Sequence, residues 1–113
     1  FRFGVWADGD FSWVHEDEWT RELKYVSETL VTDVHLVNKN LGIEIVSNDT
    51  VASHENIFLR RVRISNLFDK ERDVRVFLHQ DFRISESKIG DTGFYDPESL
   101  SLIHYKRDRY FLI

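Results

Sequence analysis

The chain has 113 residues, enough for one domain rather than two. Hydrophobic residues make up 42% and charged residues 31%, a balance typical of a globular domain and not of a disordered tail. The net charge of −5 argues against a nucleic-acid partner. No apolar run approaches the roughly 20 residues that span a bilayer, so we expect no membrane partner.

The chain contains no cysteine, and no basic-then-apolar signal segment opens it. Both observations are compatible with a reducing compartment, and we expect a cytoplasmic protein. The sequence begins with Phe1 instead of Met and ends on the apolar run Tyr110–Ile113. We therefore expect it to be a piece of a longer protein.

The first half of the chain reads as a series of strands. In "FRFGVWADGDFSWVH", an Asp-Gly pair between two aromatic-rich runs predicts a hairpin. The next stretch, "EWTRELKYVSE", fits helical and strand spacing, and we favour a strand because its neighbours are strands. "ETLVTDVHLVN" is apolar on both faces, which predicts a central strand, and "IEIVSN" returns after a turn at "NKNLG".

Two alternating runs follow, "NIFLRRVRISN" and "RDVRVFLHQDFRIS". The second places apolar residues on one face and charged residues on the other, with Gln80 interrupting the apolar face. The polar stretch "NLFDKER" separates the runs. We therefore predict one long antiparallel hairpin from about Ile57 to Ile84. Arginines line this hairpin, and the acidic residues among them favour cross-strand ion pairs over an anion site.

The closing stretch predicts a meander of three strands. Asp96 and Pro97 form a turn in which the Asp96 side chain accepts a backbone N–H. This turn joins Thr92–Tyr95 to Leu100–Tyr105, and Lys106–Arg109 turns the chain into a last strand at Tyr110–Ile113.

The whole pattern predicts about eight or nine strands in an all-β, antiparallel β-sandwich of the large, supersandwich-like kind. We expect residues 1–113 to form a single β-sandwich domain or a portion of a larger one. An apolar last strand with an unpaired edge also predicts self-association through exposed strand edges.

Residue types that carry chemistry are present but scattered. The five histidines lack the spacings of metal sites, so we expect no metal and no cofactor. Carboxylates are plentiful, but nothing in the sequence places two of them across a cleft as a glycosidase requires. We find no phosphate-binding loop, nucleophile elbow or cysteine nucleophile.

The aromatic residues allow two interpretations. Trp6, Trp13 and Trp19 are candidate platforms for stacking sugar rings, as exposed tryptophans are in many carbohydrate-binding modules. The other interpretation makes them core residues that bury a large area, and we prefer it because of their close spacing along the chain.

Four stretches together resemble a known family: "FRFGVWADGDFSWV", "ETLVTDVHLVN", "RVFLHQDFRI" and "IGDTGFYDPES…IHYKRDRYFLI". They are similar to the N-terminal β-sandwich domain of glycoside hydrolase family 15, the glucoamylase-like, glucodextranase-like and trehalase-like enzymes. "GDTGFYDP" and "HYKRDRYFL" are the most specific parts. The resemblance covers almost the whole chain.

The resemblance implies that a catalytic barrel of paired helices, absent from this chain, carries the two catalytic glutamates of an inverting α-glucosidase. No position here matches them, so the resemblance implies a non-catalytic domain whose partner is that barrel. Tyr95, His104 and Arg107 are our candidates for the contact with it. The alternative is a separate carbohydrate-binding module that uses the tryptophans.

Overall fold

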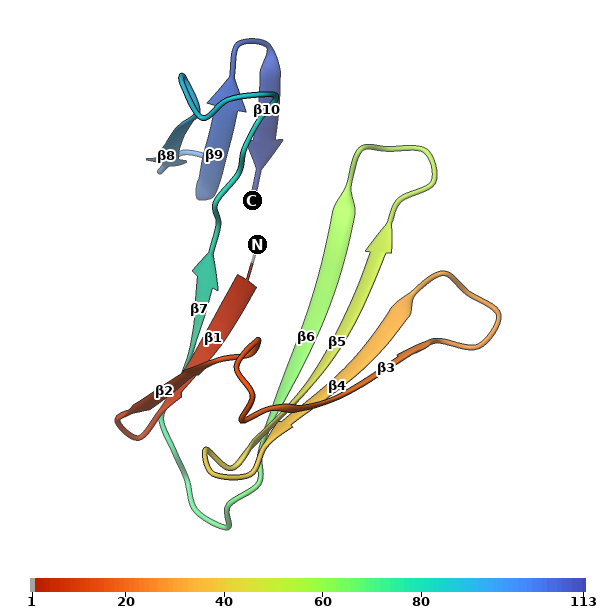
Figure 1. Cartoon of the computed structure of the whole chain (residues 1–113), viewed down its shortest axis with the longest axis vertical. Coiled ribbons are helices and arrows are strands. Elements are labelled where there is room, and N and C mark those ends of the chain that lie inside the picture. The colour runs from red at the N-terminus through yellow and green to blue at the C-terminus, as the bar shows by residue number, and fades with distance from the viewer. Residues whose placement is uncertain (1) are drawn as a thin grey trace. The chain divides into compact units, whose positions relative to one another are not determined.

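The computed structural model describes residues Arg2 to Ile113, and it consists of strands joined by turns and loops (Figure 1). It contains ten strands where about eight or nine were expected. Their bounds are β1 Arg2–Ala7, β2 Asp10–Trp13, β3 Thr20–Tyr25, β4 Thr32–Asn38, β5 Ile43–Val51, β6 Phe58–Asn66, β7 Val74–His79, β8 Thr92–Asp96, β9 Ser101–Lys106 and β10 Arg109–Leu112.

These strands form two compact units, a first unit of Arg2–Leu78 and a second unit of His79–Ile113. The first unit has a sheet of order β2-β1-β7 and a sheet of order β3-β4-β5-β6. The second unit has one sheet of order β10-β9-β8. Six strand pairs are antiparallel, which confirms the predicted all-β antiparallel class: β1–β2, β3–β4, β4–β5, β5–β6, β8–β9 and β9–β10. The expectation of a single domain stays a prediction.

The core of the first unit lies between its two sheets. Alternate residues of β1, namely Phe3, Val5 and Ala7, are buried together with Leu36 of β4 and with Ile43 and Ile45 of β5. Trp19 and Leu41, from the connecting segments, complete the cluster. This is the packing of a β-sandwich, in which one face of each sheet is dry.

Several local predictions are confirmed. The hairpin at Asp8-Gly9 joins β1 to β2, and "EWTRELKYVSE" holds the strand β3. β4 is an interior strand between β3 and β5, as its apolar pattern predicted. The meander β8-β9-β10 has the predicted connections, and the Asp96 carboxylate accepts hydrogen bonds from the backbone N–H groups of Glu98 and Ser99.

The long hairpin predicted from Ile57 to Ile84 is wrong. β6 pairs with β5, in a register that runs from Ile43↔Asn66 to Val51↔Phe58, whereas β7 pairs with β1 in the other sheet. β7 also ends at His79, short of Ile84. The alternation within each run was interpreted correctly, but alternation does not specify the partner strand. The connection between β6 and β7 is a crossover between two sheets and not a turn.

Arg72 organises this crossover. Its Nε lies 2.9 Å from the Asp8 carboxylate, and its Nη1 donates to the Leu41 carbonyl at 2.8 Å. The guanidinium also lies 4.7 Å from the centre of the Phe68 ring. Phe68 in turn covers Gly42, where a Cβ atom would come within 2.6 Å of the ring and where φ is +66°. The crossover is therefore fixed to both the β1–β2 turn and the β4–β5 turn.

The predicted cross-strand ion pairing of the arginines is confirmed at Arg60, whereas Arg72 and Arg75 form ion pairs that do not cross between paired strands. Arg60 and Asp49 occupy paired positions on β6 and β5, and Nε of Arg60 donates to Asp49 at 2.7 Å. Arg72 pairs with Asp8, and Arg75 pairs with Asp73 at 2.7 Å.

Substituting Arg72 by alanine should destabilise the first unit by about 1–3 kcal/mol, because the change leaves the buried Leu41 carbonyl without its donor. The Arg72 side chain is only 4% exposed. Arg75→Ala is the matched control, since its pair with Asp73 is exposed to solvent on both sides and should contribute much less to stability. Urea unfolding of both variants measures the difference, and equal losses would contradict the anchoring role of Arg72.

Asp8 should make the first unit sensitive to acid. Hydrogen bonds from Lys70 and then Arg72 hold the pKa of Asp8 below its ordinary value of 3.8. Because the pKa is lower in the folded state, the stability that Asp8 contributes is full above the unfolded pKa and is lost as the pH falls through the folded one. The stability difference between wild type and Asp8→Asn should therefore shrink as the pH is taken from neutral to below 3.8. A difference that stays constant over that range in urea unfolding would refute this.

Candidate functional site

The outward face of the β2-β1-β7 sheet carries a layer of aromatic side chains. Because β1 alternates, Gly4 and Trp6 point away from the core, and they pair with Trp13 and Phe11 of β2. The Phe11 ring stands edge-on to Trp13 at 4.9 Å and to Phe77 of β7 at 5.6 Å. We call this surface the aromatic–arginine face; it consists of Arg2, Gly4, Trp6, Phe11, Trp13, Arg75 and Phe77.

Gly4 makes this layer possible. A Cβ atom at this position would lie 2.5 Å from the Phe11 ring and 2.9 Å from the Trp13 ring. Such distances are far below van der Waals contact, so any side chain here would displace the rings. The two rings therefore pack directly on the backbone of β1.

Two arginines lie over the tryptophans of this face. The Arg2 guanidinium is 5.4 Å from the Trp13 ring centre, and that of Arg75 is 4.9 Å from the Trp6 ring centre. The hydrogen bond that Arg75 donates to Asp73 raises the pKa of Arg75, and the negative charge of Asp73 raises it further. The tryptophan faces are thus in cation–π contact, and the neighbouring Phe11 ring is perpendicular to Trp13. This geometry differs from a flat row of exposed rings.

Trp19 has a different environment from the other two tryptophans. It is 2% exposed and belongs to the core, and its Nε1–H donates to Ser12 Oγ at 2.8 Å. Ser12 Oγ donates in turn to the Glu16 carboxylate at 2.9 Å. The structure therefore places Trp6 and Trp13 together on one face and Trp19 on the opposite side of that sheet.

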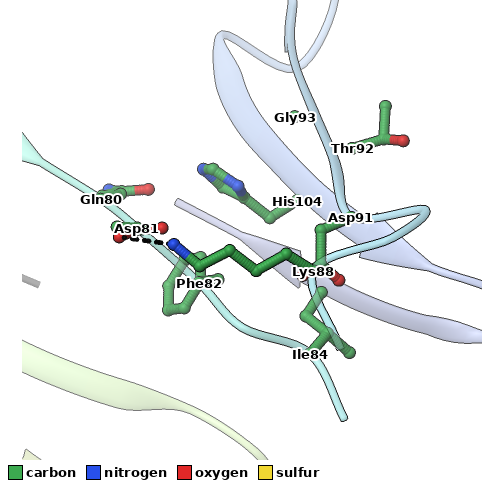
Figure 2. A pocket seen from close by; sticks show the side chains of 9 residues that line it. All are labelled: Gln80, Asp81, Phe82, Ile84, Lys88, Asp91, Thr92, Gly93 and His104. Carbon is green, nitrogen blue, oxygen red and sulfur yellow. Dashed lines mark ion pairs between the residues drawn. The ribbon is translucent and has the colours of Figure 1, made fainter. Parts of the chain in front are cut away.

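The second unit contains a hollow of about 270 Å³ beside His104 (Figure 2). We call it the His104 hollow. It is lined by acidic, basic, amide and apolar side chains and by one glycine: Gln80, Asp81, Phe82, Ile84, Lys88, Asp91, Thr92, Gly93 and His104.

His104 is held in place by packing. It pairs with Gly93 across β9 and β8, and a Cβ atom at Gly93 would lie 3.0 Å from the imidazole. Phe82 stands edge-on to the imidazole at 4.9 Å and stacks on Phe111 at 5.3 Å. The glycine leaves room for the imidazole, which forms one wall of the hollow (Figure 2).

Two polar side chains of the hollow lack hydrogen bonds. Neither polar atom of Gln80 and neither carboxylate oxygen of Asp91 has a hydrogen-bond partner among residues 2–113, although each exposes less than 1 Å². Asp91 is held by charge alone, because Lys106 Nζ lies 3.3 Å from its Oδ1. A buried polar group without a partner costs about 1–3 kcal/mol, so native proteins rarely keep one.

A second ion pair crosses the mouth of the hollow. Lys88 Nζ lies 3.5 Å from the Asp81 carboxylate, as the dashed line in Figure 2 marks. Both side chains are mostly exposed. Such a pair contributes little to stability, so both charged groups remain available to a ligand.

The three contact residues predicted from the sequence do not come together. Tyr95 pairs with Leu102 near the start of β9 and is 56% exposed, while Arg107 lies in the turn beyond the end of β9. Only His104 lines the hollow. Gln80 was not predicted as a site residue, although the sequence carries a signal for it: it is the polar residue that interrupts an apolar face.

The part of the chain that the structure describes holds no cluster of three metal-binding side chains. Among the same residues, no helix has the length and hydropathy to cross a bilayer.

Comparison with known proteins gives one informative similarity. The chain is 31% identical over 85 residues to a protein of Methanocaldococcus jannaschii that is named an uncharacterized glycosyl hydrolase. The matched region is 75% of this chain but only 14% of that relative. No protein-family profile matches the chain, and no solved structure does. The chain is therefore related to a small part of a protein that is named a glycosyl hydrolase.

Proposed function

We propose that this chain is a non-catalytic β-domain of a glycoside hydrolase, in which it supports and orients a catalytic domain located elsewhere in the parent protein. The observation that carries the proposal is the similarity to 14% of a protein named a glycosyl hydrolase. Most of that relative lies outside the matched region, which leaves ample length for a separate catalytic domain.

The carboxylates of the chain favour a supporting role. A glycosidase needs a general acid that stays protonated, which usually requires a carboxyl group in apolar surroundings. Here the pKa of Asp96 is lowered by its hydrogen bond from Ser99, and that of Asp8 by its bond from Lys70. Asp91 lies 3.3 Å from Nζ of the buried Lys106, as a structural ion pair does. These environments suit structural carboxylates better than a proton donor.

The tryptophans favour the same role over that of a separate carbohydrate-binding module. A sugar-binding platform needs an open ring face, whereas Trp6 and Trp13 have guanidinium groups over their rings and Trp19 is a core residue. The Trp19 Nε1–H is moreover satisfied by Ser12, as is typical of a tryptophan that belongs to a core.

For the parent we propose the finer assignment that the sequence resemblance implies. It is a glucoamylase-like enzyme of glycoside hydrolase family 15 that cleaves α-glucosides with inversion. One carboxylic acid protonates the leaving oxygen and one carboxylate activates water, both in a helical barrel outside this chain. Of the three candidate contacts, Tyr95 on β8 and Arg107 in the turn after β9 are exposed, and we propose these two as contacts with that barrel; His104 lines the hollow instead.

The chain alone should release no glucose from maltose, maltooligosaccharides, isomaltose or trehalose, because no position in it matches the two catalytic glutamates that the family resemblance implies. A coupled glucose assay on repurified protein measures this. Asp81→Asn and Asp91→Asn variants serve as controls, since these two carboxylates share the His104 hollow. Turnover that persists on repurification and disappears in either variant would refute the non-catalytic role.

We also propose that the chain self-associates through β10, one of the two edge strands of the second unit's sheet. Tyr110, Phe111 and Leu112 are all exposed there, and an apolar edge strand recruits another strand. Light scattering should show a mass that rises with protein concentration. Leu112→Lys should reduce the association without disturbing the stack of Phe111 on Phe82. A mass that stays monomeric at high micromolar concentration would contradict the proposal.

A further inference from the structure

We propose that the His104 hollow of the second unit binds one pyranose ring of a saccharide. The choice of a sugar rests on the proposed function, because a domain attached to a glycoside hydrolase meets saccharides, while the site itself rests on the geometry below. Binding of a sugar here would give a ligand-binding role to a domain that is otherwise proposed only to support its neighbour.

The size of the hollow suits a single sugar ring. Its volume of about 270 Å³ lies just under the range of roughly 300–1,000 Å³ that is typical of sites for drug-sized ligands. Apolar Phe82 and Ile84 can contact the C–H face of a pyranose, while charged and polar groups surround them. A mixed lining of this kind matches a ring that has an apolar face and a rim of hydroxyl groups.

The polar groups of the hollow match the chemistry of hydroxyl groups, which both donate and accept hydrogen bonds. Lys88 offers donors and Asp81 offers acceptors at the exposed mouth of the hollow. The imidazole of His104 offers one of each when it is neutral. All three side chains line the hollow and are drawn in Figure 2.

Gln80 is the residue that distinguishes a binding site from a gap in packing. Its carboxamide is buried and has no hydrogen-bond partner among the described residues, so turning it toward a ligand breaks no existing bond. A glutamine has three rotatable bonds, which allow that turn, and its amide can donate to one hydroxyl and accept from another. A residue needed only for packing would be expected to be apolar here.

Gly93 determines how much of the hollow is open. Because a Cβ atom at this position would lie 3.0 Å from the imidazole, a larger residue at 93 would move His104. Gly93→Ala should therefore weaken binding without removing any polar group. This variant tests the shape of the hollow separately from its hydrogen bonds.

The test is a titration of the 113-residue chain with glucose and with maltose, followed by amide chemical shifts. We expect saturable shifts confined to residues 80–93 and 104, with a Kd on the order of 1 mM, as suits so small a ligand. Gln80→Leu should weaken binding roughly tenfold. Its thermal midpoint should equal or exceed that of wild type, because the change removes an unpaired buried amide.

The control variants change residues that lie outside the hollow. Tyr95→Ala and Trp13→Ala change aromatic residues outside the hollow and should leave the Kd unchanged. If Gln80→Leu does not fold, the exposed Lys88→Ala replaces it, with a smaller expected loss. The proposal is overturned if the shifts fail to saturate up to roughly 20 mM sugar. It is also overturned if the shifts occur at Trp6 and Trp13, or if neither Gln80→Leu nor Gly93→Ala changes the Kd. The supporting role would survive such a failure, because glucose release tests it separately.

Discussion

The alternation of side chains along β1 is the constraint on which the first unit depends. Three of its residues, Phe3, Val5 and Ala7, fill the core between the sheets, so the residues between them must face the other way. A shift of one residue would exchange the two sets and would put Trp6 into the core. The aromatic–arginine face is thus a consequence of the same register that builds the core.

Buried charges fix the irregular parts of both units. In the first unit, Arg72 links the crossover to the β1–β2 turn through Asp8 and to the β4–β5 turn through the Leu41 carbonyl. In the second unit, Lys106 on β9 reaches the Ser87 carbonyl and the Asp91 carboxylate, which fixes the loop that precedes β8. In each case a long cationic side chain satisfies groups that the sheets leave unpaired. These polar contacts fix the β6–β7 connection and the loop before β8, which have few apolar side chains to pack into a core.

Sequence periodicity predicted most strands because each strand has one drier face. The turns at Asp8-Gly9 and Asp96-Pro97 were predicted from their residue types. The pairing of β6 and β7 was not predictable in the same way. Both runs alternate, and a seven-residue polar stretch between them is compatible with a long turn or with a crossover. What decides between the two is Arg72 together with Phe68 on Gly42, and these contacts join residues that are far apart in the chain. The His104 hollow was missed for the same reason, since Gln80 and His104 belong to different segments.

The state of the polar groups separates scaffold from candidate site. A chain of hydrogen bonds runs from Trp19 through Ser12 to Glu16, and each donor in it has an acceptor. The Arg72 guanidinium likewise donates to the Asp8 carboxylate and to the Leu41 carbonyl. Gln80 and Asp91 break this rule within one small hollow. Natural proteins tend to violate local rules of stability at functional sites, where a ligand completes what the fold leaves open. A supporting domain gains nothing from an unpaired buried amide, so the residue that weakens the fold here is also the one that points to a ligand.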